Sequence, residues 1–340
     1  MKATKAGAAV IETGRTFYSA SGRWASEQLL RALNSGLPFS PDVLRTLDTL
    51  RKDEWKAFDE ALIEEGMIRL RGVADLMAAG LTIPVANAMG KTLLEWEKVT
   101  DMNPAITSLS GIDRSEDDSQ EFSLDSIPLP ITHKDFNINL RTLSASRERG
   151  ESLDTTQART AGRLVAERLE QIYFAGGPTF GGKAIHGLTN HPDRNLANFG
   201  TNGAWSATAK TGENILADVL TLIAAAEAAR MFGPYRIYVP TNVSTKLSND
   251  FKANSDKTIR QRVLEVDGIQ GVTVVDQLST SQVLLVQMTR DVVSLVDGEG
   301  LQSVQWDVEG GFQVRFKAFA IQIPLIRSDA QGRSGVVHMT

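Results

Sequence analysis

The sequence contains no cysteine and no long apolar run. The first absence excludes disulfides, thiolate nucleophiles and zinc sites built on cysteine. The second argues against a membrane helix, which needs about 20 successive apolar residues. The most apolar stretch, 220–229, is interrupted by Glu227 and is typical of a buried helix. The N-terminal residues also lack a continuous apolar segment, because Glu12 and Arg15 interrupt it, so we expect no signal peptide.

Charge of one sign is not in large excess either. The 340 residues include 36 Lys and Arg against 41 Asp and Glu, for a net charge of −5. The whole chain is therefore not a strongly basic nucleic-acid binder, although a local basic face is compatible with this balance. The hydrophobic share of 42% supports a sizeable core, and the length suggests about two domains.

Histidine is scarce, with His133, His186, His191 and His338 as its four positions. His186 and His191 lie five apart in an expected loop, without cysteine or a clear carboxylate partner. Zinc normally takes three or four protein ligands. We therefore expect ordinary loop histidines and no metal site, and we interpret His133 and His338 as structural.

A phosphate-binding pattern is present with one residue changed. Residues 177–184 read GPTFGGKA, which is G-x-x-x-x-G-K with Ala184 where Ser or Thr should bind magnesium. A P-loop needs a strand before the glycines and a helix after them. Here a long predicted helix comes first, and Gly187 and Pro192 follow. We interpret the segment as a helix stop followed by a glycine-rich hairpin or loop, and we expect no cofactor.

An acidic stretch lies between two extended runs. Its spacing lacks the D-x-[DN]-x-[DN]-G pattern of a calcium loop, and its residues are Asp113, Glu116, Asp117, Asp118 and Glu121. The run 92–99 before it has the alternation of a strand. The pattern predicts a long projecting β-hairpin with an acidic tip. A hairpin of this kind has little core of its own, so we expect it to lie on a partner.

The clearest predicted element is a helix over 154–176. Residues 154–157 resemble a capping box, and Gly176 is expected to end the helix. Its apolar residues recur at helical spacing: Ala158, Ala161, Val165, Leu169 and Ile172. The preceding run 131–143 predicts a half-buried strand, with Phe136, Ile138 and Leu140 on one face.

The other predicted elements form a mixed pattern. A helix opening at Ser40 and a second one ending near Gly80 precede the hairpin, and a polar loop region covers 181–211. Further helices are predicted at 213–231, 241–251 and 258–266. Strands are predicted at 235–240, 272–276, 283–288, 293–298, 304–308 and 312–323; we expect the second and third to be buried on both faces and the fourth to lead into a turn.

Residues 1–40 predict an arm that a partner orders, because the segment is weakly apolar and mostly basic. Motifs for catalysis are lacking, whereas an arm, an acidic hairpin and one long helix are present. Projections that cannot bury themselves imply neighbouring subunits, so the residues favour a self-assembling structural protein.

Several segments resemble the encapsulin-like major capsid proteins of tailed phages. The similarity covers about residues 41–340 and is carried by the number and order of matching segments. These are KDEWKAFDEALIEEG (52–66), GVADLMAAGLT (72–82), the stretch 128–177, IYVPTNVSTKLSNDF (237–251), NSDKTIRQRVLEVDGI (254–269) and AIQIPLIRSDAQGRSGVVH (320–338).

The resemblance implies an α+β chain with the Hong Kong 97-type capsid fold. It divides the chain into an N-terminal arm, a helical segment, an extension loop, a peripheral domain with the long spine helix, an axial domain, and returning peripheral strands with the C-terminus. The corresponding ranges are 1–40, 41–80, 81–127, 128–176, 177–296 and 297–340.

The implied function is that of a major capsid protein, not an enzyme. Pentamers and hexamers would form an icosahedral head around double-stranded DNA, with non-specific DNA contacts. Portal and decoration or scaffolding proteins would be further partners, and the protein would assemble in the host cytoplasm into the virion. The alternative is an encapsulin compartment that encloses cargo enzymes. A third, an enzyme using 177–184 as a phosphate site, has less support.

Assembly contacts are expected at two groups of residues. The extension loop would contribute Asp113, Arg114, Glu116, Asp117, Asp118 and Glu121, and the N-terminal arm would contribute Lys2, Lys5, Arg15 and Arg23. We expect the acidic loop to lie across a neighbouring subunit and to pair with basic residues there.

Overall fold

The computed structural model describes residues 52–99, 122–139, 155–252, 256–308, 313–329 and 331–340, with the single positions 107, 109, 119 and 120. Helices are mixed there with a four-stranded and a five-stranded sheet, which confirms the α+β class. No helix in these ranges is long and apolar enough to cross a membrane. The expected assembly contacts lie outside the described residues: Lys2, Lys5, Arg15, Arg23, Asp113, Arg114, Glu116, Asp117, Asp118 and Glu121.

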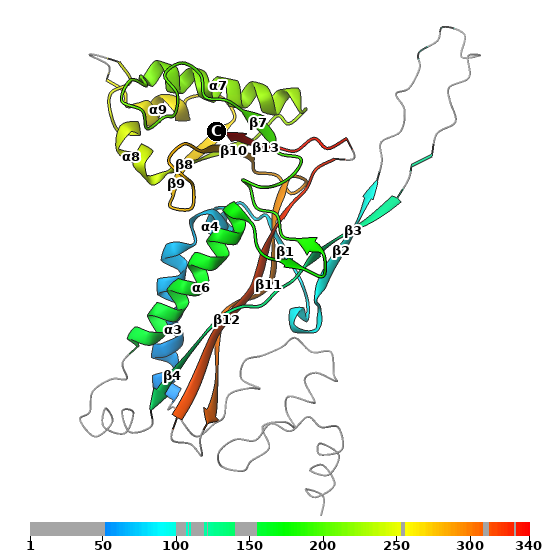
Figure 1. The fold of residues 1–340 in the computed structure, drawn as a ribbon, viewed down its shortest axis with the longest axis vertical. Helices are drawn as coiled ribbons and strands as arrows, with labels where there is room; N and C mark the ends of the chain where they lie inside the picture. Colours follow the sequence, from blue (N-terminus) through cyan, green and yellow to red (C-terminus); the bar gives the residue numbers. More distant parts are fainter. Residues whose placement is uncertain are drawn as a thin grey trace, which may run out of the picture.

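The first sheet, which we call the peripheral sheet, has the strand order β1-β11-β12-β4. Its strands are β1 (Thr82–Pro84), β11 (Val293–Val308), β12 (Gln313–Ile326) and β4 (Thr132–Asn139). β1 runs parallel to β11, and the other neighbours are antiparallel. The helices α3 (Lys52–Arg69) and α6 (Thr156–Ala175) pack against one face of this sheet (Figure 1).

Three phenylalanines join these helices to the sheet. Phe58 of α3, Phe136 of β4 and Phe316 of β12 have ring centroids 5.0–5.7 Å apart, within the usual range for aromatic pairs. Phe136 and Ile138 point to this side, whereas Asp135 and its alternating neighbours are exposed. The half-buried strand predicted from the alternation is thus confirmed for the described residues.

The long helix α6 is confirmed, and it ends where Gly176 takes a φ of +87°. Its buried residues follow the predicted helical spacing. The predicted capping box at 154–157 is wrong as far as Thr155 is concerned. Thr155 precedes the first helical residue, but its φ of −87° and ψ of 2° are not extended, and its side chain makes no capping hydrogen bond.

The predicted turn after 293–298 is also wrong, because β11 continues through it to Val308. The Gly-Glu-Gly sequence forms bulges, with the register to β12 shifting around Glu299. Gly298 has no room for a side chain, since an added Cβ would lie 2.4 Å from the Cβ of Ala88 in the 3-10 helix η2 (Ala88–Gly90). The glycine here serves close packing rather than a chain reversal.

The second sheet, which we call the axial sheet, has the order β7-β13-β10-β8-β9. Its strands are β7 (Asn195–Ala197), β13 (Val336–Met339), β10 (Val283–Gln287), β8 (Tyr235–Pro240) and β9 (Ile269–Val275). The helices α7 (Gly212–Ala228), α8 (Thr241–Leu247) and α9 (Ile259–Leu264) share a core with this sheet. β10 is buried throughout, as expected for a central strand.

β9 departs from the prediction of burial on both faces. Val272 and Val275 are buried, but Thr273 and Val274 are only partly covered. The reason is its position, because β9 is an edge strand that pairs only with β8 among the described residues. Between the two sheets lies the short helix α4 (Arg71–Ala78), which contacts α6, β9 and β11.

Candidate assembly site at the base of the β2–β3 ribbon

A two-stranded ribbon projects from the body of the molecule (Figure 1). It pairs β2 (Leu93–Val99) with β3 (Phe122–Pro128) in antiparallel register, from Leu93 opposite Pro128 to Val99 opposite Phe122. The predicted hairpin is therefore confirmed for its paired strands. The sequence between the strands holds the acidic residues expected at the tip.

The two faces of the ribbon have different surroundings. Leu94, Trp96 and Ile127 pack with the peripheral sheet, on the face opposite α3 and α6. Successive side chains in a strand alternate between faces. Leu93 and Leu124 lie on the other face and are 46% and 64% exposed. The ribbon thus rests on the body by one face and presents apolar side chains to solvent by the other.

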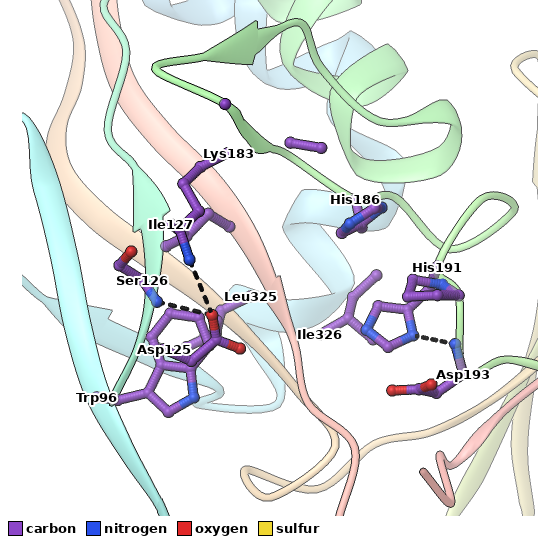
Figure 2. A pocket seen from close by; sticks show the side chains of 13 residues that line it. Trp96, Asp125, Ser126, Ile127, Lys183, His186, His191, Asp193, Leu325 and Ile326 are labelled. Carbon is purple, nitrogen blue, oxygen red and sulfur yellow. Dashed lines mark hydrogen bonds and ion pairs between the residues drawn. The ribbon is translucent and has the colours of Figure 1, made fainter. Parts of the chain in front are cut away.

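A small hairpin supports the base of the ribbon. It pairs β5 (Thr179–Phe180) with β6 (Lys183–Ala184), and its turn residues Gly181 and Gly182 have φ of +57° and +80°. Positive φ at both central positions is the geometry that favours glycine in tight hairpins. The turn brings Lys183 Nζ to 3.8 Å from Asp125 Oδ1 of β3 (Figure 2). Both side chains are substantially exposed, so this ion pair contributes at most about 1 kcal/mol.

This hairpin occupies the place of the P-loop-like sequence. The long helix α6 precedes it, Lys183 itself begins β6, and a loop instead of a helix follows. The interpretation as a helix stop followed by a glycine-rich hairpin is confirmed. Backbone amides at the start of a helix, which cradle phosphate in a true P-loop, are not present at this point.

A cavity of about 330 Å³ lies between the ribbon base, the hairpin and the following loop (Figure 2). Lys183, His186 and His191 line it, together with the indole of Trp96 and the end of β12. The two imidazole rings meet edge to face, with centroids 5.7 Å apart. The cavity is therefore lined by apolar side chains together with ionisable groups of both signs, including Asp125 and Asp193.

The loop beside the cavity is held by its own hydrogen bonds. The Asp193 amide donates to His191 Nδ1 at 3.2 Å, and Ser328 donates to the Asp193 carboxylate at 2.6 Å. Throughout the described part of the chain, no three His, Asp or Glu side chains gather as a metal-binding group. These hydrogen bonds hold in place the loop that carries His186 and His191.

The other two histidines, His133 and His338, do not line this cavity. His133 is exposed on β4, with Nδ1 3.4 Å from the Ile131 carbonyl. His338 is buried in β13 and accepts a hydrogen bond from Arg194 Nε at 3.3 Å. Burial and the nearby Arg194 charge lower the pKa of His338 from 6.5 to about 4. A neutral imidazole held in this way is a structural group at neutral pH.

The fold as a whole is similar to those of solved virus-like particle and capsid structures. The chain is similar to the virus-like particle from Pyrococcus furiosus, with a TM-score of 0.61 and 16% identity over 85% of this chain and 99% of that chain. It is similar to the capsid of Myoviridae phage XM1, with a TM-score of 0.58 and 14% identity over 78% and 90%.

A third similar structure is the capsid of the native GTA particle, with a TM-score of 0.56 and 13% identity over 87% and 93% of the two chains. These likenesses show that the chain has the Hong Kong 97-type capsid fold, as the resemblance implied. The chain belongs to the Family of unknown function (DUF6260), which matches residues 45–339. No match is found among curated proteins.

Sequence reasoning found the ribbon but missed what holds its base. In the sequence, Lys183 belongs to a pattern that resembles a nucleotide-binding loop. In the structure, it forms an ion pair with Asp125 of the ribbon. Trp96 was part of the predicted strand, yet nothing in its neighbours indicated the cavity that it lines. Partners far apart in the chain leave no local pattern, so only the fold brings them together.

Proposed function

We propose that the protein is the major capsid protein of a tailed phage. Pentamers and hexamers of the chain would build an icosahedral head around double-stranded DNA. The portal and decoration or scaffolding proteins would be its other partners, and assembly would take place in the host cytoplasm. The support is the capsid fold together with one local observation, the ribbon that leaves apolar side chains in solvent.

The ribbon favours contact with neighbouring subunits because the face turned away from the body leaves apolar side chains uncovered. Leu93, Leu124 and Phe122 are between 46% and 67% exposed, and Glu95 and Glu97 share their face. A two-stranded ribbon is marginally stable in water unless a further surface packs on it. A second copy of the chain would cover this face and order the ribbon.

The face of the peripheral sheet opposite α3 and α6 offers a surface for the acidic loop of a neighbour. Arg315 is exposed there, and Lys317 lies 3.6 Å from Asp135 and 5.8 Å from the centroid of the Trp306 ring. These positive charges are opposite in sign to the residues expected at the ribbon tip. Charge complementarity of this kind fixes register and suppresses wrong pairings more than it adds affinity.

The alternative is an encapsulin compartment that encloses cargo enzymes. The likeness to the virus-like particle from Pyrococcus furiosus keeps it open, because one fold serves both kinds of shell. An enzymatic role would require a site, and the P-loop-like segment forms a hairpin instead.

Expression of the full chain, followed by electron microscopy, tests the proposal. Closed shells are expected from the wild type, and particles purified from phage-producing cells should contain DNA. Shells that carry enzymes and no DNA would favour the compartment. A chain that stays monomeric over a wide range of concentration and salt would contradict both shell functions.

A matched pair of variants tests the role of the ribbon. Leu124→Glu adds a charge to the exposed ribbon face, whereas Leu196→Glu adds the same charge to β7, where the leucine is equally exposed at 65%. We expect Leu124→Glu to reduce shell yield strongly and Leu196→Glu to reduce it less, with both variants folded by circular dichroism. Equal yields from the two variants would show that the exposed face of the ribbon does not take part in assembly.

A further inference from the structure

The strand β9 forms an open edge of the axial sheet, because β8 is its only partner strand among the described residues. Tyr235 of β8 donates its amide to the Gly268 carbonyl at 2.7 Å, so alternate residues of β8, including Ile237, also turn their backbone groups toward β9. In a parallel pair, one residue of each aligned couple makes these bonds and its partner turns away. Val272, the partner of Ile237, and Val274 therefore direct their backbone groups to the open edge.

Two arginines bind the carbonyl groups of this edge. Arg71 Nη1 donates to the Val274 carbonyl at 2.7 Å, and Arg260 Nη2 donates to the Val272 carbonyl at 2.8 Å. A hydrogen bond from a guanidinium is charge-assisted and about twice as strong as one between neutral groups. Two acceptors that an added strand would need are therefore already bonded.

The arginines reach the edge from opposite faces of the axial sheet. Arg71 begins α4, whose buried residues share a core with Val275. Arg260 belongs to α9, whose buried residues share the second core with Val272. Side chains alternate between the faces of a strand, so residues three apart point in opposite directions. Each helix thus extends one guanidinium around the strand to the same edge.

Both helices that carry these arginines have defined positions. Thr273 of β9 donates to Asp75 of α4 at 2.9 Å, and Asp75 also pairs with Arg236 of β8 at 2.6 Å. The start of α9 is held by a complete capping box between Thr258 and Gln261. The two guanidinium groups are therefore presented to the edge by anchored elements.

An open edge of this composition favours pairing with another chain. Its sequence IQGVTVV (269–275) is rich in β-branched residues and contains neither charge nor proline, as is typical of segments that add to one another as strands. Natural proteins protect such edges with charged side chains. The approach of a second β9 would break both arginine bonds and bring the guanidinium groups of the two copies together. Their repulsion and lost hydration oppose the pairing.

We infer that Arg71 and Arg260 close the edge of the axial sheet to a second copy of the chain. With both arginines in place, subunits meet through other surfaces. Without them, β9 of one copy pairs with β9 of another. This role concerns one edge of one subunit, so it does not depend on the proposed shell function.

Two double variants of the full chain test this role. Arg71→Met with Arg260→Met removes both donors and keeps long unbranched side chains. The control, Arg163→Met with Arg262→Met, removes the same charge from α6 and α9, where each arginine pairs with a nearby glutamate. Material outside closed shells is measured by sedimentation and electron microscopy, with folding checked by circular dichroism. We expect severalfold more irregular or fibrous aggregate from the first double variant than from the wild type, and no increase from the control.

Hydrogen exchange identifies the surface through which the variant associates. In the aggregate of the first double variant, peptides covering 269–275 should exchange more slowly than in the unassociated protein, because a paired edge uses the amides of Val272 and Val274. Aggregate without this protection, or equal aggregation of the two double variants, overturns the inference. Arg260→Met alone should give part of the increase. If the first double variant does not fold, the absence of any increase in Arg260→Met overturns the inference.

Discussion

Lys210 and Asp218 form an ion pair in the interior of the axial part of the molecule. Nζ lies 2.7 Å from Oδ2, and the two side chains are 0% and 3% exposed. Asp218 also accepts from the Trp205 indole at 2.8 Å and the Gly200 amide at 3.0 Å. Lys210 donates to the Thr201 carbonyl at 2.9 Å. The pair therefore fixes the loop that leads into α7.

Removing one partner of this pair is expected to be costly. Lys210→Met leaves the Asp218 charge buried without its cation, which destabilises proteins by about 3–5 kcal/mol. The control is Lys252→Met, because Lys252 pairs with Glu213 at the surface and both are more than half exposed. That variant should lose about 1 kcal/mol or less. Urea unfolding of both variants gives the comparison, and equal losses would contradict the structural role of the buried pair.

The contact between α3 and α6 gives a second prediction. An added Cβ at Gly162 would lie 2.5 Å from the backbone oxygen of Leu62. Gly162→Ala should therefore destabilise the protein by about 1–3 kcal/mol from overpacking, although alanine is the better helix former. At Gly66 the added Cβ meets the end of the Leu301 side chain, which can move. Thermal unfolding should show a clearly smaller loss for Gly66→Ala.

Local patterns predicted the elements that have a strong period of their own. The helical spacing of its apolar residues and Gly176 predicted α6, and an unbroken apolar run predicted β10. The sequence did not predict which strands lie at the centre of a sheet and which lie at its edge. β9 was predicted from the apolar run at 272–276 but lies at an edge, so Thr273 and Val274 are partly exposed.

Long-range partners could not be predicted from the sequence. The ion pair between Lys183 and Asp125 joins a hairpin to a ribbon far away in the chain. Glu170 belongs to a regular helix, and its contact with Gly72 depends on how α4 packs. The sequence predicted a turn at Gly298, whereas the structure has a bulge, because glycine satisfies close packing as well as chain reversal.

The hairpin geometry predicts that ATP does not bind at Lys183. Because the chain continues from Lys183 into a strand and a loop, no helix N-terminus lies there whose amides could cradle a phosphate. Titration calorimetry with ATP and magnesium should show no saturable heat for the wild type or for Lys183→Ala. Saturable binding that Lys183→Ala abolishes would restore the nucleotide interpretation. The stability of Lys183→Ala should change by about 1 kcal/mol or less, because its partner Asp125 is partly solvated.

His338 predicts a loss of stability in mild acid. Its folded-state pKa of about 4 lies below the ordinary value of 6.5, because burial and Arg194 disfavour the charged imidazolium. Between these values the unfolded chain binds more protons than the folded chain, so the free energy of unfolding falls as the pH decreases. The contribution is present above about pH 6.5 and is lost as the pH falls toward 4, with a size of about 1–3 kcal/mol.

A variant isolates the contribution of this histidine from those of the acidic groups. His338→Asn removes the titrating ring but keeps a polar side chain that can accept from Arg194 Nε. Its free energy of unfolding, measured in urea from pH 4 to pH 7, should depend less on pH than that of the wild type. The overall stability of the variant is expected to be lower at pH 7, because the smaller side chain fills the buried site less well. A pH dependence identical to that of the wild type would show that His338 does not titrate in this range.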